Sequence, residues 1–160
     1  MKRKLMSFIK YCRPVYDLYY YLGTGLLNFL KLFVRTDERL ILFNSFGGKS
    51  FNDSPRAIYE AMCRDPRFAG FRFVWAFQEP EKFTVKNGEK IKSDTLPYFL
   101  TALKARVWVT NSSLERGLGF VGKHTFFVNT WHGTPLKKMG NDLKEQNVSL
   151  KKKNTWNMDL

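Results

Sequence analysis

The chain has 160 residues, of which 44% are hydrophobic and 16% aromatic, so it can build one domain with a real core and is not a disordered protein. Its 27 Lys and Arg against 14 Asp and Glu give a net charge of +13, which predicts anionic partners such as a membrane surface, nucleic acid or phosphate-bearing substrates. Cys12 and Cys63 lie far apart without metal-ligand spacing, which favours a reduced, cytosolic protein over a disulfide or zinc framework.

The first 35 residues carry a basic, apolar pattern. No compact apolar core or small-residue cleavage site is present, which excludes a signal peptide. A spanning helix is disfavoured because the apolar stretch 18–34 is interrupted by glycine, asparagine and lysine and is shorter than the ~20 residues that a bilayer core needs. We expect residues 1–35 to form an amphipathic helical segment that lies on an anionic membrane; the alternative is a helix packed on its own domain. The predicted membrane-binding residues are Lys2, Arg3, Lys4, Lys10 and Arg13.

Residues 36–160 alternate strand and helix signals, which predicts an α/β domain with a Rossmann-like parallel sheet. The continuous apolar run 40–43 is typical of a central strand covered on both faces. Ser54 as cap and Pro55 in the first turn predict a helix that ends before Asp65-Pro66, and strand 71–77 follows. Further on we expect an edge strand at 90–92, a helix capped by Asp94 through residue 103, and strands at 107–110 and 125–128.

Two connecting segments are of interest. The loop 44–50 contains two glycines and a lysine without Walker A spacing; it either brings backbone amides to a ligand or is a flexible turn. The segment 114–123 is rich in glycine and charge, and we expect a mobile loop there.

Polar residues follow several of the predicted strands. In open parallel sheets ligands bind at the carboxyl ends of the strands, so Asn44, Asn111 and His132 are expected on one edge. Asn111 taken alone is better explained as a loop-capping amide. His124 falls at the start of its strand and is interpreted as structural.

The stretch 129–140 has the strongest chemical pattern. His132 comes just after a strand, and Thr134 and Pro135 suit the N-cap and first position of a helix. The amides at such a helix start, with Lys137 and Lys138, can hold an anion, and a histidine near neutral pH can accept a proton beside it. A turn or packing histidine is the alternative. No Asp-rich metal pair accompanies it, so we expect no metal ion and no cofactor.

These residues resemble a known family, the CDP-glycerol glycerophosphotransferases that make teichoic acid polymers in Gram-positive bacteria. Its pattern Thr-Trp-His-Gly-Thr-Pro-Leu-Lys-Lys, then a hydrophobic residue, Gly, any residue and Asp, is matched by Thr130 through Lys138, Met139, Gly140 and Asp142. The segments 54–56 and 110–111 also agree with the family. The resemblance covers about residues 40–160 and implies the N-terminal half of a GT-B fold, with the donor-binding domain missing from this chain.

The resemblance also implies an activity. His132 would be the catalytic base that takes a proton from an acceptor hydroxyl as it attacks CDP-glycerol, with CMP leaving. Expected substrate-binding residues are Trp131, Gly133, Thr134, Lys137, Lys138 and Asn111. The expected partners are CDP-glycerol, a lipid-linked polyol-phosphate acceptor and the anionic cytoplasmic face of the membrane, where the protein is peripheral. We expect the chain alone to be inactive.

Two other functions stay open. The same fold can use CDP-ribitol or another phospho-sugar donor. A non-catalytic basic module that docks on membranes or nucleic acid belongs to a different class; because the sequence carries no RNA-binding signature, we expect no nucleic-acid partner.

Overall fold

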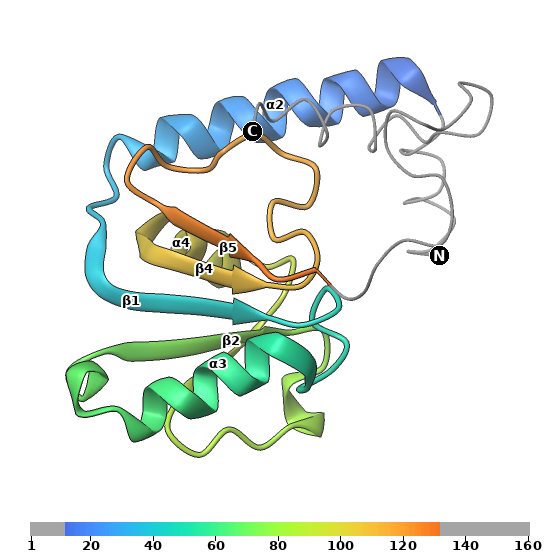
Figure 1. The fold of residues 1–160 in the computed structure, drawn as a ribbon. Helices are drawn as coiled ribbons and strands as arrows, with labels where there is room; N and C mark the ends of the chain where they lie inside the picture. Colours follow the sequence, from blue (N-terminus) through green and yellow to red (C-terminus); the bar gives the residue numbers. More distant parts are fainter. Residues whose placement is uncertain (1–11, 132–160) are drawn as a thin grey trace.

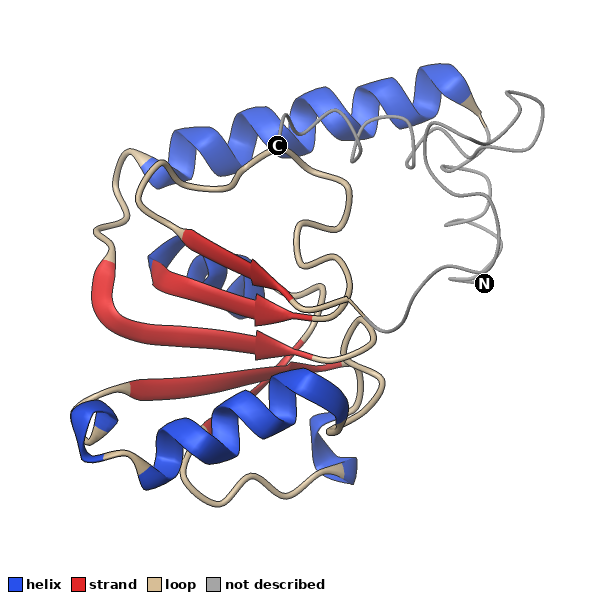
Figure 2. Cartoon of the chain, viewed as in Figure 1, coloured by secondary structure: helices blue, strands red, loops and turns tan. Residues whose placement is uncertain are grey.

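The computed structural model describes residues 12–131 as an α/β domain (Figures 1 and 2). Its long first helix precedes alternating strands and helices. The elements are α2 (Arg13–Lys31), β1 (Asp37–Asn44), α3 (Asp53–Arg64), η1 (Pro66–Phe68), β2 (Arg72–Phe77), η2 (Pro80–Lys82), β3 (Glu89–Lys92), α4 (Leu96–Lys104), β4 (Ala105–Thr110) and β5 (Phe126–Asn129).

The five strands form one sheet in the order β3-β2-β1-β4-β5, and every pairing is parallel. The predicted Rossmann-like parallel sheet is therefore confirmed, including the edge strand β3. The chain first builds the sheet outward from β1 through β2 and β3, then crosses back to place β4 on the other side of β1. This reversal makes the gap between β1 and β4 the topological switch point, where parallel sheets bind ligands.

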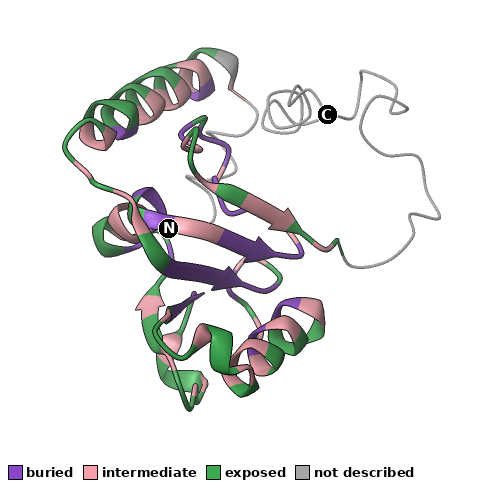
Figure 3. Cartoon of the chain, turned by 60° about the vertical axis from the view of Figure 1, so that its left-hand side comes forward, coloured by how far each residue is buried: buried purple, intermediate pink, exposed green. Residues whose placement is uncertain are grey.

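Side chains that alternate along the central strands build two cores, one on each face of the sheet. Leu40 and Leu42 of β1 point to the face covered by α4 and α2, with Tyr98, Trp108 and Leu114 among their neighbours. The opposite face, covered by α3, holds a core rich in stacked and edge-on rings. Its buried members are Ile41, Phe43, Tyr59, Phe73, Trp75, Phe77 and Val109. Burial on both faces explains why β1 reads as an unbroken apolar run (Figure 3).

One face of α2 packs on the domain. Tyr16 and Leu27 are buried, and Asn28 and Lys31 donate to the carbonyls of residues 119 and 121 at 3.0 Å each. Gly23 allows this close approach, because a Cβ there would lie 2.9 Å from Leu118 Cδ2. The helix is thus docked on the segment 114–122.

The other face of α2 is apolar and exposed. Exposed positions recur along α2, whose outer face is coloured as exposed in Figure 3, and the large apolar side chains among them are spaced as on one face of a helix. They are Leu18, Tyr21, Leu22, Leu26, Phe29, Leu32 and Phe33. Within residues 12–131 no helix combines the length and the apolarity that crossing a bilayer would demand.

Three local predictions were wrong. Ser54 lies inside the first turn of α3, whose N-cap is Asn52, while Pro55 and the end before Asp65-Pro66 are as expected. Asp94 does not cap α4, whose N-cap is Thr95. The segment 114–123 is not a loosely held loop, because three of its apolar side chains are buried beneath α2 and beside α4. These are Leu114, Leu118 and Phe120.

Candidate functional site

Three strands end side by side at the switch point. The last residue of β1, Asn44, is paired in register with Thr110 of β4, which is paired in turn with Asn129 of β5. The segments that follow these strands are 45–52, 111–117 and 130–131, so all three meet at the carboxyl edge (Figure 1). The prediction that the residues after these strands share one edge is confirmed for Asn44 and Asn111.

The loop after β1, residues 45–48, is held by backbone and side-chain hydrogen bonds; we call it the glycine loop. Its amides of Phe46, Gly47 and Gly48 donate to Asn111 Oδ1 at 2.8 Å, Ser112 Oγ at 2.9 Å and the Ser45 carbonyl at 2.9 Å. All three residues have positive φ, between 47° and 83°. Because these three amides are already bonded within the protein, they are not free to bind a ligand.

Asn111 joins this loop to the start of α3. It is fully buried, and while its Oδ1 accepts from Phe46, its Nδ2 donates to the Asp53 carboxylate at 2.6 Å. Asp53 itself is left-handed, with φ of 61°. Asn111 therefore holds the glycine loop and the start of α3 together, as the loop-capping interpretation describes. Its direct contact with substrate stays a prediction.

Arg116 was missed by sequence reasoning. Its Nε lies 2.8 Å from Asp94 Oδ1, an ion pair without hydrogen-bond geometry at Nε, and its Nη2 donates to the Gly47 carbonyl at 3.1 Å. The guanidinium also lies over the Tyr98 ring, 5.8 Å from its centroid. Burial raises the pKa of Tyr98, which keeps its hydroxyl protonated to donate to the Leu114 carbonyl. A lone arginine in a glycine-rich segment was the available signal.

β5 delivers Trp131 to the same edge. The Thr130 amide continues the sheet pairing by donating to the Thr110 carbonyl at 2.8 Å, and Trp131 follows with φ of 54° and 45% of its surface exposed. Trp131 is the last described residue. The other predicted site residues, His132, Gly133, Thr134, Lys137 and Lys138, lie outside the described residues, as do Lys2, Arg3, Lys4 and Lys10; Arg13 is the first residue of α2, and its side chain is not described.

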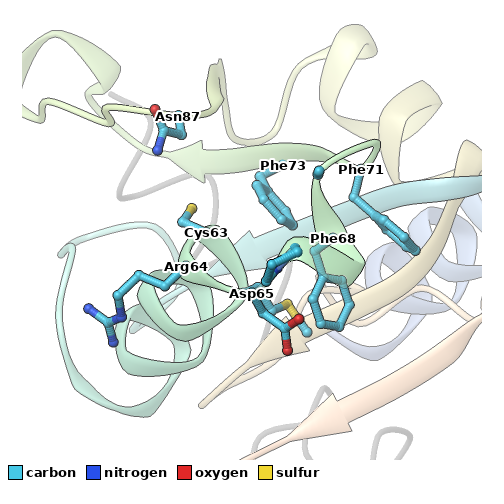
Figure 4. Close-up of a pocket in the computed structure, with 10 residues that line it drawn as sticks. Cys63, Arg64, Asp65, Phe68, Phe71, Phe73 and Asn87 are labelled. Atoms are coloured by element: carbon cyan, nitrogen blue, oxygen red, sulfur yellow. The ribbon is translucent and has the colours of Figure 1, made fainter.

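Among the described residues, no group of three or more His, Cys, Asp or Glu side chains lies close enough together to hold a metal ion. A cavity of about 280 Å³ does occur, but at the opposite edge, between the end of α3 and the start of β2 (Figure 4). Phe68, Phe71 and Phe73 line it together with Arg64, Asp65 and Asn87, and it lies away from the switch point. We therefore place the candidate site at the carboxyl edge.

Comparison with known proteins points to one family. The family model described as CDP-Glycerol:Poly(glycerophosphate) glycerophosphotransferase matches residues 26–159. The teichoic acid poly(glycerol phosphate) polymerase of Staphylococcus epidermidis is 38% identical over 107 residues, which are 66% of this chain and 14% of that protein. The Bacillus spizizenii protein of the same name is 34% identical over 68% of this chain and 28% of its own. The Staphylococcus aureus teichoic acid glycerol-phosphate transferase is 31% identical over 76% of this chain and 30% of its own.

Solved structures of a teichoic acid polymerase resemble this domain as well. The wall teichoic acid polymerase TagF superposes with a TM-score of 0.65 at 29% identity, covering 82% of this chain and 34% of that one. A TagF variant soaked with CDPG gives 0.67 at 29% identity, covering 82% and 32%. The chain thus spans less than a third of the curated relatives named above.

Proposed function

The chain belongs to the CDP-glycerol:poly(glycerophosphate) glycerophosphotransferase family, and from this premise we propose that residues 36–160 form the acceptor side of such an enzyme. The reaction transfers glycerol phosphate from CDP-glycerol to a hydroxyl of a membrane-linked teichoic acid acceptor and releases CMP. One observation carries the proposal: β5 ends beside β4, one strand away from the switch point between β1 and β4, and brings Trp131, directly followed in sequence by His132, to the same carboxyl edge. The likeness to TagF supports a GT-B arrangement with this domain as its first half.

In the proposed step His132 accepts the proton of the acceptor hydroxyl, whose oxygen attacks the β-phosphorus of CDP-glycerol. A new phosphorus–oxygen bond forms, and the bond from that phosphorus to the bridging oxygen breaks, so that CMP leaves with the electron pair. Such a base typically contributes about 10²- to 10⁴-fold to the rate. Lys137 and Lys138 are assigned to the phosphates of the polymer, because their ammonium groups would follow the helix start that the sequence predicts at Thr134 and Pro135, and such a start attracts anions.

A chimera tests the base assignment. This chain replaces the matching segment of the Staphylococcus epidermidis polymerase, and CMP release and polymer length are measured with CDP-glycerol and a lipid-linked acceptor. His132→Ala is expected to lower turnover about 10²-fold or more. His124→Ala is the matched control, since His124 is exposed just before β5, away from the candidate site, and is the chain's other histidine.

Normal polymer synthesis by the His132→Ala chimera would rule out His132 as the base. The chain alone is expected to release no CMP, because nothing in the proposal assigns its residues to the nucleotide. A donor panel with CDP-glycerol and CDP-ribitol on the active chimera separates the alternative donor from the proposed one.

We also propose that the exposed apolar face of α2 lies on the anionic cytoplasmic membrane surface. Its aromatic and aliphatic side chains fit the headgroup boundary, and each Lys or Arg of the preceding residues contributes about 1 kcal/mol near an anionic leaflet. Deleting residues 1–35 would uncover Leu118 and Phe120, so point variants are the better test.

The test is vesicle flotation with anionic and neutral lipids. Leu22→Glu with Leu26→Glu is expected to abolish flotation with anionic vesicles, because two charges would enter the apolar face. Leu96→Glu, at an exposed leucine of α4, is the matched control and should float as the wild type does. Unchanged flotation of the double variant would show that this face of α2 does not contact the membrane.

A further inference from the structure

The side chain of Asn129 bonds two segments at once. At the last residue of β5, its Nδ2 donates to the Ser112 carbonyl at 3.2 Å, and its Oδ1 accepts from the Trp131 amide at 3.1 Å. The first bond reaches across to the segment after β4, and the second closes a turn over Thr130. A carboxamide satisfies both because one end donates and the other accepts, which a carboxylate or a methyl group cannot do.

The turn that Asn129 closes holds Trp131 in an unfavourable backbone conformation. Its φ of 54° costs a non-glycine residue about 1–2 kcal/mol, so surrounding bonds must maintain it. Thr130 supplies part of that support, since its amide and hydroxyl both bond to the Thr110 carbonyl, at 2.8 and 3.3 Å. The Trp131 amide is bonded by Asn129 itself.

The partner of Asn129 is itself anchored. While the Ser112 carbonyl accepts from Asn129, its hydroxyl accepts from the Gly47 amide at 2.9 Å. The Gly47 carbonyl in turn accepts from Arg116 Nη2 and from Gln78 Nε2. A continuous series of contacts therefore runs from the glycine loop through Ser112 and Asn129 to the backbone of Trp131.

We propose that Asn129 is a positioning residue of the acceptor side: its carboxamide holds Trp131 in the left-handed conformation and so determines the direction in which the chain leaves β5 toward His132. The inference rests on the proposed function for its catalytic consequence. Its structural part, the bond from Asn129 to the Trp131 amide, stands on the described residues alone. Two experiments test the two parts separately.

Amide hydrogen exchange of the 160-residue chain tests the structural part. In Asn129→Ala the Trp131 amide should exchange about tenfold faster or more, because its acceptor is gone, whereas Asn129→Asp keeps an acceptor oxygen and should stay within about threefold of the wild type. Asn87→Ala is the matched control, an exposed asparagine at the opposite edge of the sheet, and should leave Trp131 exchange unchanged. Equal Trp131 exchange in the wild type and in Asn129→Ala overturns the inference.

Turnover of the chimera tests the catalytic part. Asn129→Ala should lower kcat by about 10- to 100-fold, because a misplacement of about 1 Å in the reacting groups costs up to about 100-fold, with KM for CDP-glycerol unchanged within about twofold. Asn129→Asp should lose less, because it keeps the acceptor for the Trp131 amide. Asn87→Ala should behave as the wild type. If His132→Ala is inactive but Asn129→Ala keeps full kcat, the positioning role is wrong and the base assignment survives. If His132→Ala is active, the proposed function falls, and the exchange experiment still decides the structural part.

Discussion

Arg116 and Asp94 form an ion pair, 2.8 Å from Nε to Oδ1, that joins the segment before α4 to the segment beneath α2. Both residues have left-handed backbones, with φ of 57° and 62°. The same guanidinium donates to the Gly47 carbonyl, so one largely buried side chain connects three loops near the carboxyl edge. These contacts help to hold Arg116 and Asp94 in their left-handed backbone conformations.

Arg116→Ala should therefore lower the free energy of unfolding by about 2 kcal/mol, because Asp94 and the Gly47 carbonyl lose a charged partner. Arg116→Lys should recover only part of this, since an ammonium cannot reproduce the planar, forked contacts. Urea unfolding measures both. The control is Arg56→Ala, whose pair with Glu60 is exposed and should contribute less than about 1 kcal/mol. Equal losses at the two arginines would contradict the connecting role.

Asn111→Asp should destabilise the protein by about 2 kcal/mol at pH 7. The new carboxylate would face that of Asp53, which now accepts from Asn111 Nδ2 at 2.6 Å. The swapped pair, Asn111→Asp with Asp53→Asn, should regain most of the stability at pH 7, and a double-mutant cycle in urea measures the coupling. Additive losses would show that the two residues do not interact.

The two glycines of α2 offer a matched comparison. Gly25→Ala should stabilise the protein by about 0.5–1 kcal/mol, because a Cβ there meets nothing within 4 Å and alanine favours the helix. Gly23→Ala should gain less or lose stability, because its Cβ would lie 2.9 Å from Leu118 Cδ2 and force that side chain to move. Chemical unfolding of both variants measures the difference. A gain at Gly23 equal to that at Gly25 would mean that α2 is not docked on Leu118.

The raised pKa of Tyr59 predicts that the free energy of unfolding depends on pH in the alkaline range. Burial, with a hydrogen bond to Cys63, raises the pKa of Tyr59 to about 12, above the value of about 10 for an unfolded tyrosine. The folded state thus holds the proton more tightly, so this stabilisation is complete below pH 10 and is lost as pH rises through 12. Tyr59→Phe should cost about 1 kcal/mol near neutral pH, since the Asn87 amide loses its acceptor, and the difference from wild type should narrow above pH 10.

Urea unfolding between pH 8 and 12 follows both proteins. Tyr21→Phe, on the exposed face of α2, is the control and should stay within about 0.5 kcal/mol of wild type at neutral pH. A difference between Tyr59→Phe and wild type that stays constant up to pH 12 would contradict the raised pKa.

The order of strands and helices could be predicted from local pattern. Residues 40–43 and 71–77 are apolar on both faces, which requires a covered parallel sheet, and the observed β1 and β2 follow with shifts of a few residues. The N-caps of the helices were less predictable. Ser54 and Asp94 have side chains that suit an N-cap, but the N-caps of α3 and α4 are Asn52 and Thr95. Asp94 is used by Arg116, a partner 22 residues away that no local pattern indicates.

By itself the sequence determined the α/β class, the parallel sheet and the family, because periodicity and short motifs are local properties of the chain. The tertiary structure decided which strands are neighbours, that α2 is docked by one face and exposed on the other, and that the amides of the glycine loop are already bonded. It also brought Asn129, Ser112 and Gly47 into one series of contacts. These outcomes depend on pairings between segments tens of residues apart, whose partners are selected by the packing of the whole domain.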